Sequence, residues 1–228
     1  MRKLRLAFAV VLAILASGAA AAAGGADRLR VAPDPDPDLA AAWSAYSSGD
    51  LPRAVQRFRA AAERDDRLAQ FNLAVMLIGG EGEPRDPVAG LQWLRRAADA
   101  GLARAQYALG VFTERGELVP RSLTDATAWY LKAAEQGWRD AQVSVATQFF
   151  LGRGAPRDMA QAAIWYERAA EQGDEAASYI IASLYEHGDG VPTDLRRAYF
   201  WYDRAAADGE PAARIKAQEM LGRLRTAK

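Results

Sequence analysis

The sequence predicts an all-α solenoid of stacked helix pairs, and three observations predict it. Several residue types recur with a period of 36 residues: tryptophan at Trp93, Trp129, Trp165 and Trp201, and glycine at Gly101, Gly137, Gly173 and Gly209. Apolar residues fall on one helical face in every copy. Residues that begin and end helices stand at matching places. A fixed period of this length is typical of repeats that bury their apolar faces by stacking on one another.

The first 26 residues have the layout of a secretory signal peptide. Arg2, Lys3 and Arg5 give a positive start, residues 6–16 are apolar, and small residues follow. The apolar stretch is short for a membrane helix, which needs about 20 residues. We expect cleavage after Ala23 or Ala26 and a periplasmic or secreted protein; an uncleaved anchor is the alternative.

Between this leader and the repeats lie two further segments. Residues 27–38 contain Pro-Asp-Pro-Asp-Pro-Asp and predict an extended spacer, because proline restricts itself and the residue before it. Residues 39–66 predict a degenerate repeat. It keeps Phe58, Ala61 and Ala62 in register but has Arg57 where the others have tryptophan.

Four full repeats are predicted at residues 67–101, 102–137, 138–173 and 174–209, each with two helices. In the second repeat these helices span 103–115 and about 123–136. The second helix carries its apolar face at Ala126, Trp129, Tyr130, Ala133 and Ala134. Second helices should be capped by Asp86, Ser122, Asp158 and Asp194. Residues 210–228 predict a C-terminal capping helix.

The repeats resemble Sel1-like repeats, a branch of the tetratricopeptide class. The last repeat carries the family pattern from Leu184 to Val191, then Asp194, and then Ala198, Trp201-Tyr202 and Ala205-Ala206. The resemblance implies a right-handed α-α superhelical solenoid that binds proteins or peptides. Exported bacterial members serve as adaptors, envelope regulators or parts of secretion systems. One cysteine-rich subgroup binds or hydrolyses β-lactams, whereas this chain has no cysteine.

In such stacks the first helices line a concave groove, so their outward positions are the candidate partner-binding residues. We call these positions the first-helix row: Phe71, Val75, Ile78, Tyr107, Val111, Glu114, Val143, Thr147, Phe150, Tyr179, Ser183 and Glu186. The row mixes apolar, aromatic and acidic residues, as a peptide groove does. Simple packing between helices is the competing interpretation for each of them.

Composition argues against other classes of protein. With 29 basic and 29 acidic residues, the chain has no positive excess to attract nucleic acid, nor a reason to insert stably in a membrane once the leader is removed. No cysteine and a single histidine, His187, leave no basis for a metal site, a cofactor or a catalytic triad. We therefore expect a non-enzymatic envelope adaptor or regulator that binds a protein or peptide. An envelope hydrolase acting on cell-wall-like or β-lactam substrates, and a purely structural spacer, are the alternatives.

Overall fold

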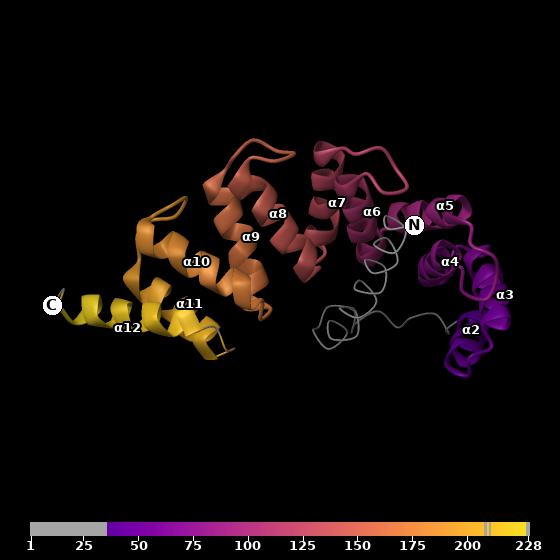
Figure 1. Ribbon diagram of the computed structural model, residues 1–228, viewed down its shortest axis with the longest axis horizontal. Coiled ribbons are helices and arrows are strands. Elements are labelled where there is room, and N and C mark those ends of the chain that lie inside the picture. Colours follow the sequence, from indigo (N-terminus) through magenta and orange to yellow (C-terminus); the bar gives the residue numbers. More distant parts are fainter. Residues whose placement is uncertain (1–35, 208, 210, 227–228) are drawn as a thin grey trace. The chain divides into compact units, whose positions relative to one another are not determined.

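The computed structural model describes residues 36–207, 209 and 211–226, which form helices and no strands (Figure 1). The predicted signal peptide and most of the predicted spacer lie outside these residues. The chain falls into two compact units, Met1–Arg121 (unit 1) and Ser122–Lys228 (unit 2), which are described separately.

Within the described part, unit 1 holds five helices, and each packs on the next. They are α2 (Pro37–Ser47), α3 (Leu51–Ala62), α4 (Arg67–Gly79), α5 (Pro87–Asp99) and α6 (Ala103–Arg115). Helix α6 has the bounds that the sequence predicted.

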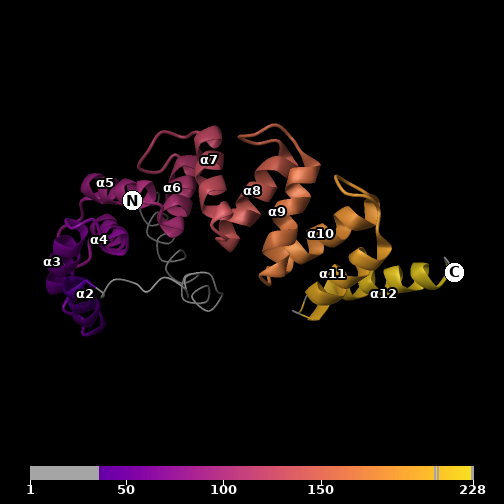
Figure 2. The ribbon, with the colours of Figure 1, turned by 180° about the vertical axis from the view of Figure 1, so that it is seen from behind.

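The described residues of unit 2 form six helices, and here too each packs on the next. They are α7 (Leu123–Glu135), α8 (Arg139–Leu151), α9 (Met159–Glu171), α10 (Glu175–His187), α11 (Leu195–Ala207) and α12 (Pro211–Thr226). Helices α10, α11 and α12 lie side by side, as both views show (Figure 2). Helix α12 lies within the segment predicted to form a C-terminal capping helix.

The helix ends form as the sequence predicted. Asp86, Ser122 and Asp158 accept hydrogen bonds from backbone amides at the starts of α5, α7 and α9. Asp194 accepts from the amides of Arg196 and Arg197 at 2.9 and 3.0 Å. Left-handed glycines end the first helices at Gly80, Gly116, Gly152 and Gly188. Orphan amides and carbonyls at these ends are thereby satisfied.

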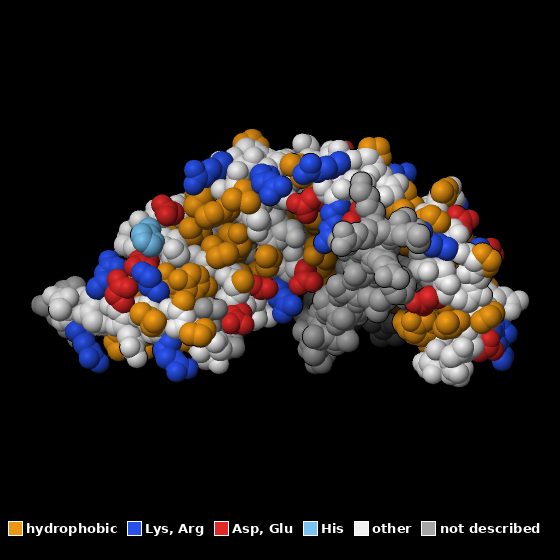
Figure 3. All heavy atoms as spheres, in the orientation of Figure 1, with side chains coloured by type: hydrophobic (Ala, Val, Ile, Leu, Met, Phe, Trp, Pro, Cys, Tyr) orange, Lys and Arg blue, Asp and Glu red, His pale blue; other side chains and the backbone are white. Residues whose placement is uncertain are grey.

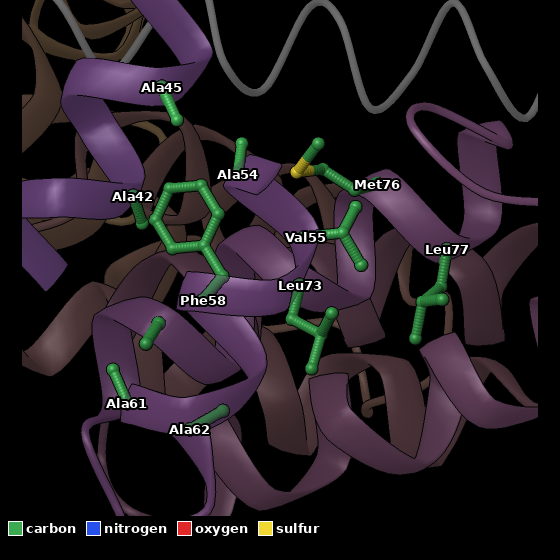
Figure 4. Close-up of a cluster of buried hydrophobic side chains, with 11 residues drawn as sticks. Ala42, Ala45, Ala54, Val55, Phe58, Ala61, Ala62, Leu73, Met76 and Leu77 are labelled. Carbon is green, nitrogen blue, oxygen red and sulfur yellow. The ribbon is translucent and has the colours of Figure 1, made fainter. Parts of the chain in front are cut away.

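Alanines let helices approach closely around one large side chain in unit 1. Phe58 is 1% exposed, and its ring lies beside Ala42 in the core formed by α2, α3 and α4 (Figure 4). Helix α5 also approaches α4 closely at Gly90, where a Cβ atom would stand 2.7 Å from Ile78 Cγ1 and 2.9 Å from the Ala74 carbonyl oxygen. The other repeats have alanine at this position (Ala126, Ala162 and Ala198).

The last residues of the predicted spacer belong to the first described helix. Asp36 caps α2, and Asp38 lies in its first turn. Arg64 pairs with Asp36 at 2.7 Å and with Asp38 at 2.6 Å, and Arg57 also pairs with Asp38 at 2.6 Å. These arginines hold the pKa values of both carboxyl groups below their usual range. Arg57, which replaces the repeat tryptophan, thus joins α3 to α2.

In the first, third and fourth full repeats, a loop glycine packs against the start of the preceding second helix. A Cβ atom on Gly154 would stand 2.3 Å from the Leu123 carbonyl oxygen, and one on Gly190 would stand 2.3 Å from that of Met159. Only glycine permits such an approach together with a positive φ. The equivalent residue in the second repeat is Leu118, which adopts φ 61° and is half-exposed.

A row of buried glutamines makes a second link between successive helix pairs. Their side-chain amides donate to a carbonyl oxygen near the end of the preceding second helix: Gln70 to Ala62 at 3.3 Å, Gln106 to Ala98 at 3.1 Å and Gln142 to Ala134 at 3.3 Å. The sequence analysis missed these residues, although they share the 36-residue spacing.

Candidate protein-interaction surface

The first-helix row of unit 1 is mostly covered. Phe71, Val75, Ile78 and Val111 are only 1%, 8%, 3% and 6% exposed, whereas Tyr107 and Glu114 are half-buried. The four apolar members therefore pack between helices, as the competing interpretation has it. A partner role for the row stays a prediction, and it depends on the members that keep open surface.

The first-helix row of unit 2 is more accessible. Val143, Thr147, Phe150, Tyr179 and Ser183 are half-buried. Hydrophobic side chains gather over α8, α9 and α10 on the face shown in Figure 3.

Contacts with second helices hold this part of the row in place. The Phe150 ring meets that of Tyr166 edge-on at 6.3 Å, and the Tyr179 ring meets that of Tyr202 at 5.2 Å. The Thr147 hydroxyl lies 3.1 Å from the Tyr166 hydroxyl. Aromatic rings fixed in this way lose little freedom when a partner binds.

The carboxylate of Glu186 is buried and has partners in other helices of unit 2. Its side chain is 4% exposed. It accepts hydrogen bonds from the Tyr202 hydroxyl at 2.9 Å and from Lys216 and Arg223 of α12, each at 3.2 Å. Burial alone would raise the pKa of Glu186, but Tyr202 and Lys216 hold that pKa below its usual range. The cations that pair with this glutamate therefore come from α12 of the same chain.

The sequence analysis missed three side chains that continue the row into α2. Leu39, Trp43 and Tyr46 precede Phe71, Val75 and Ile78 by 32 residues, because the turn of the first repeat is shorter than the later loops. Trp43 is 42% exposed, and the Tyr46 hydroxyl donates to Glu81 at 3.4 Å. These three residues match the row once the shorter turn of the first repeat is taken into account.

One group of residues near the end of α10 invites comparison with a hydrolase. Ser183 Oγ lies 3.4 Å from His187 Nδ1, with Glu186 nearby in the sequence. However, His187 Nδ1 also lies 2.9 Å from the Ser183 carbonyl oxygen, which can only accept, so Nδ1 carries the proton. It cannot remove a proton from Ser183. Glu186 faces Tyr202, Lys216 and Arg223, and the set does not form a nucleophile–base–orienter arrangement.

Among the described residues, no cluster of His, Cys, Asp and Glu side chains has the makings of a metal site. Nor does that part of the chain contain a helix long and apolar enough to cross a membrane.

Helix pairs linked by repeated loop and glutamine contacts, with a variable outward row, define an all-α repeat scaffold. A family model for the Sel1 repeat matches residues 67–102, 103–138, 139–174 and 176–210. The chain belongs to the Sel1 repeat family, whose repeats form a scaffold fold that generally mediates protein interactions.

Two solved structures support this assignment. A protective antigen of uropathogenic Escherichia coli with an SLR fold is 32% identical, with a TM-score of 0.71 over 80% of this chain. This chain spans only 40% of that protein. A Sel1 repeat protein from Oxalobacter formigenes is 28% identical, with a TM-score of 0.73, over 79% of this chain and 74% of the other. A comparison with curated proteins found no match.

Proposed function

We propose that this protein is an exported scaffold that binds a protein or peptide partner through its first-helix row, as an adaptor or regulator in an envelope process. The observation that carries the proposal is the contrast between the two kinds of helix. Second helices repeat tryptophan, tyrosine and alanine in their buried faces. First helices keep different half-buried side chains, among them Tyr107, Phe150 and Tyr179. A surface that varies on a constant scaffold suits recognition of a specific partner.

Photo-crosslinking from single sites tests the binding face. We would place benzoylphenylalanine at Tyr107 or Tyr179 and, as matched controls, at Ile164 or Phe200, which are 43% and 54% exposed on the second helices α9 and α11. Irradiation of intact cells should give a discrete crosslinked partner from Tyr107 and Tyr179 alone. Adducts from Ile164 and Phe200 only would move the binding face to the second helices.

Alanine substitution gives an independent measure of affinity. Aromatic anchors commonly contribute about 2 kcal/mol or more to binding. The double variant Tyr107→Ala/Tyr179→Ala should therefore bind the crosslinked partner at least ~10-fold more weakly while its helical circular-dichroism spectrum is unchanged. Undiminished binding would argue against the row as the site.

Export is the second part of the proposal and rests on the charged start, short apolar stretch and small residues of the leader. N-terminal sequencing of protein from fractionated cells should find Gly24 or Asp27 as the first residue, outside the cytoplasm. Protein that retains Met1 in the membrane fraction would overturn it.

A further inference from the structure

Helix α12 has the place of a first helix in the repeat pattern. By the 36-residue spacing, Ile215 stands where α10 has Tyr179, and Gly222 stands where α10 has Glu186. Helix α12 packs on α11, and both ribbon views show the two helices together at the C-terminal end of unit 2 (Figures 1 and 2). The described residues of unit 2 contain no second helix after α12. The face that would receive such a helix is therefore open.

The preceding repeats show what covers this face elsewhere. In the third repeat, Thr147 and Phe150 of α8 contact Tyr166 of α9, with 6.3 Å between the centres of the two rings. In the fourth repeat, the Tyr179 ring of α10 meets the Tyr202 ring of α11 at 5.2 Å. Each is a contact between a first helix and the second helix that follows it. The face thus has the shape that accommodates a helix.

The equivalent surface of α12 is exposed and partly apolar. We call it the α12 face: Ile215, Gln218, Glu219 and Gly222. All four residues are exposed, and Ile215 is 70% exposed. The last element of a repeat array needs a polar outer surface for solubility. An isoleucine in the middle of that surface does not serve solubility, so it calls for another explanation.

Gly222 lies inside α12 without a structural reason within the described chain. A Cβ atom on Gly222 would meet no atom within 4 Å. Glycine inside a helix lowers stability relative to alanine. In the first full repeat the equivalent residue is Ile78, which lies against α5 at Gly90. Gly222 therefore stands where a first helix meets its second helix, and it leaves room for a large side chain from a docking helix.

Basic side chains flank the α12 face on both sides, as the helical spacing places them. Lys216 and Arg223 lie on one side and pair with Glu186 at 3.2 Å each. Arg214 and Arg225 lie on the other side, are exposed, and form no ion pair among the described residues. Eleven residues of helix separate these two arginines by about 16 Å.

The charges of α12 favour an acidic ligand. The helix contains four basic residues and one acidic residue, Glu219, which pairs with Lys216 at 3.3 Å. A positive charge therefore remains beside the α12 face, at Arg214 and Arg225. Complementary charge favours a partner with carboxylates in register with these two arginines.

We infer that the α12 face binds an acidic amphipathic helix of a partner protein, which takes the place of a second helix. A bulky apolar side chain of that helix lies over Gly222 beside Ile215, and its carboxylates lie near Arg214 and Arg225. The inference rests on the proposed function in that the chain is a protein-binding scaffold, and it adds a binding surface beyond the first-helix row.

Peptide selection tests this inference without knowledge of the natural partner. A phage library of random peptides of about 15 residues, enough for four helical turns, is first depleted on the variant Arg214→Glu/Arg225→Glu and then panned on the purified protein. Selected peptides are synthesised, and their affinities are measured by fluorescence polarisation. The control variant Arg95→Glu/Arg153→Glu makes the same change of charge at two exposed arginines outside α12. Circular dichroism and thermal melts establish that each variant is folded.

The selected peptides should combine Asp or Glu with apolar residues at spacings of three and four. Arg214→Glu/Arg225→Glu should weaken their binding at least ~10-fold, whereas the control variant should change it less than about 2-fold. A proline in the middle of the peptide should abolish binding, because the bound form is a helix.

Gly222 gives a second measurement that does not depend on charge. Gly222→Ala and Gly222→Leu should leave the melting temperature of the protein unchanged or raise it, because no atom stands in the way of the new side chain. Gly222→Leu should nevertheless weaken peptide binding at least ~10-fold, because it fills the space meant for the partner. A merely structural glycine would show the opposite pattern, with a lower melting temperature and unchanged binding.

Other outcomes would overturn the inference. These are a selection that yields basic peptides or none that depends on the two arginines, and undiminished binding to Gly222→Leu. A dimer that Ile215→Glu dissociates in sedimentation velocity would assign the face to a second copy of the chain instead. Binding to phosphatidylglycerol vesicles that the arginine variant loses, without peptide binding, would assign it to a membrane. The crosslinks from Tyr107 and Tyr179 test the proposed function separately from all of these results.

Discussion

At the scale of single residues, identical positions in the repeat pattern have different surroundings. Trp165 and Trp201 are 6% and 4% exposed, whereas Trp93 and Trp129 are half-buried. Each ring has a cation near its face: Arg96, Lys132, Arg168 and Arg204 lie 4.6, 4.0, 4.5 and 5.6 Å from the respective ring centres. The sequence shows the pairing of tryptophan with a cation three residues later, but it does not show how deeply each ring is buried.

Replacement of these tryptophans should therefore have unequal effects on stability. Trp165→Ala should lower the free energy of unfolding by roughly 3–5 kcal/mol, the usual cost of deleting a large buried aromatic. Trp129→Ala should cost only about 1–2 kcal/mol, because its ring is less deeply buried than that of Trp165. Phe200→Ala, at a 54% exposed position, is the control and should cost under about 1 kcal/mol in the same denaturant melts. Equal losses at Trp129 and Trp165 would contradict the difference in burial.

Glu186 should make the attachment of α12 dependent on pH. Because the pKa of Glu186 in the folded protein is lowered, its carboxylate stabilises the fold at neutral pH, and this stabilisation is lost as the pH falls below about 4.5 through the lowered value. Glu186→Gln should therefore cost about 1.5–3 kcal/mol at pH 7, the range for hydrogen bonds to a charged group, and progressively less toward pH 3.

Hydrogen exchange of the α12 amides, combined with urea melts at both pH values, would measure this effect. Glu219→Gln is the matched control, because Glu219 pairs with the same Lys216 at 3.3 Å but is half-exposed. A cost at Glu186 that does not change with pH would show that its charge is not what holds the helix.

At the scale of elements, one loop has a strained backbone at a position where the other full repeats have glycine. Leu118 adopts φ 61° where Gly82, Gly154 and Gly190 stand in the other repeats. A left-handed conformation costs an L-residue roughly 1–2 kcal/mol, while glycine loses about 0.5–1 kcal/mol more backbone entropy on folding. The balance favours glycine at this position.

We expect Leu118→Gly to raise the free energy of unfolding by about 0.5–1 kcal/mol, measured in urea. The converse change, Gly154→Ala, should lower it by more than about 2 kcal/mol, because its Cβ would stand 2.3 Å from the Leu123 carbonyl oxygen and 2.5 Å from Thr127 Oγ1. A destabilising Leu118→Gly would mean that the leucine side chain makes a contact worth more than the strain.

At the scale of the whole molecule, the sequence predicted what repeats and missed what does not. Period and capping residues located the helices of the repeats, and α6 matches its predicted bounds. The sequence could not predict the partners of Glu186, because Lys216 and Arg223 lie 30 and 37 residues away and belong to a helix outside the repeats. Trp43 and Tyr46 were missed because the first repeat departs from the common spacing. A fixed period predicts the fold well. It cannot show which of the residues that depart from the period lie at the candidate interaction surface.

The backward-reaching loop contacts have a consequence for how such a chain can change in length. Gly154 meets the start of α7, and Gly190 meets the start of α9 in the same way. A helix pair of this kind therefore has a loop that contacts the preceding pair, and its second helix begins with a surface that the next loop can contact. A duplicated copy of residues 139–174 placed after residue 174 would find its counterpart surfaces already present on either side. Adding whole repeats keeps the same kind of junction between neighbours, so such a chain can lengthen its first-helix row without a change in its core.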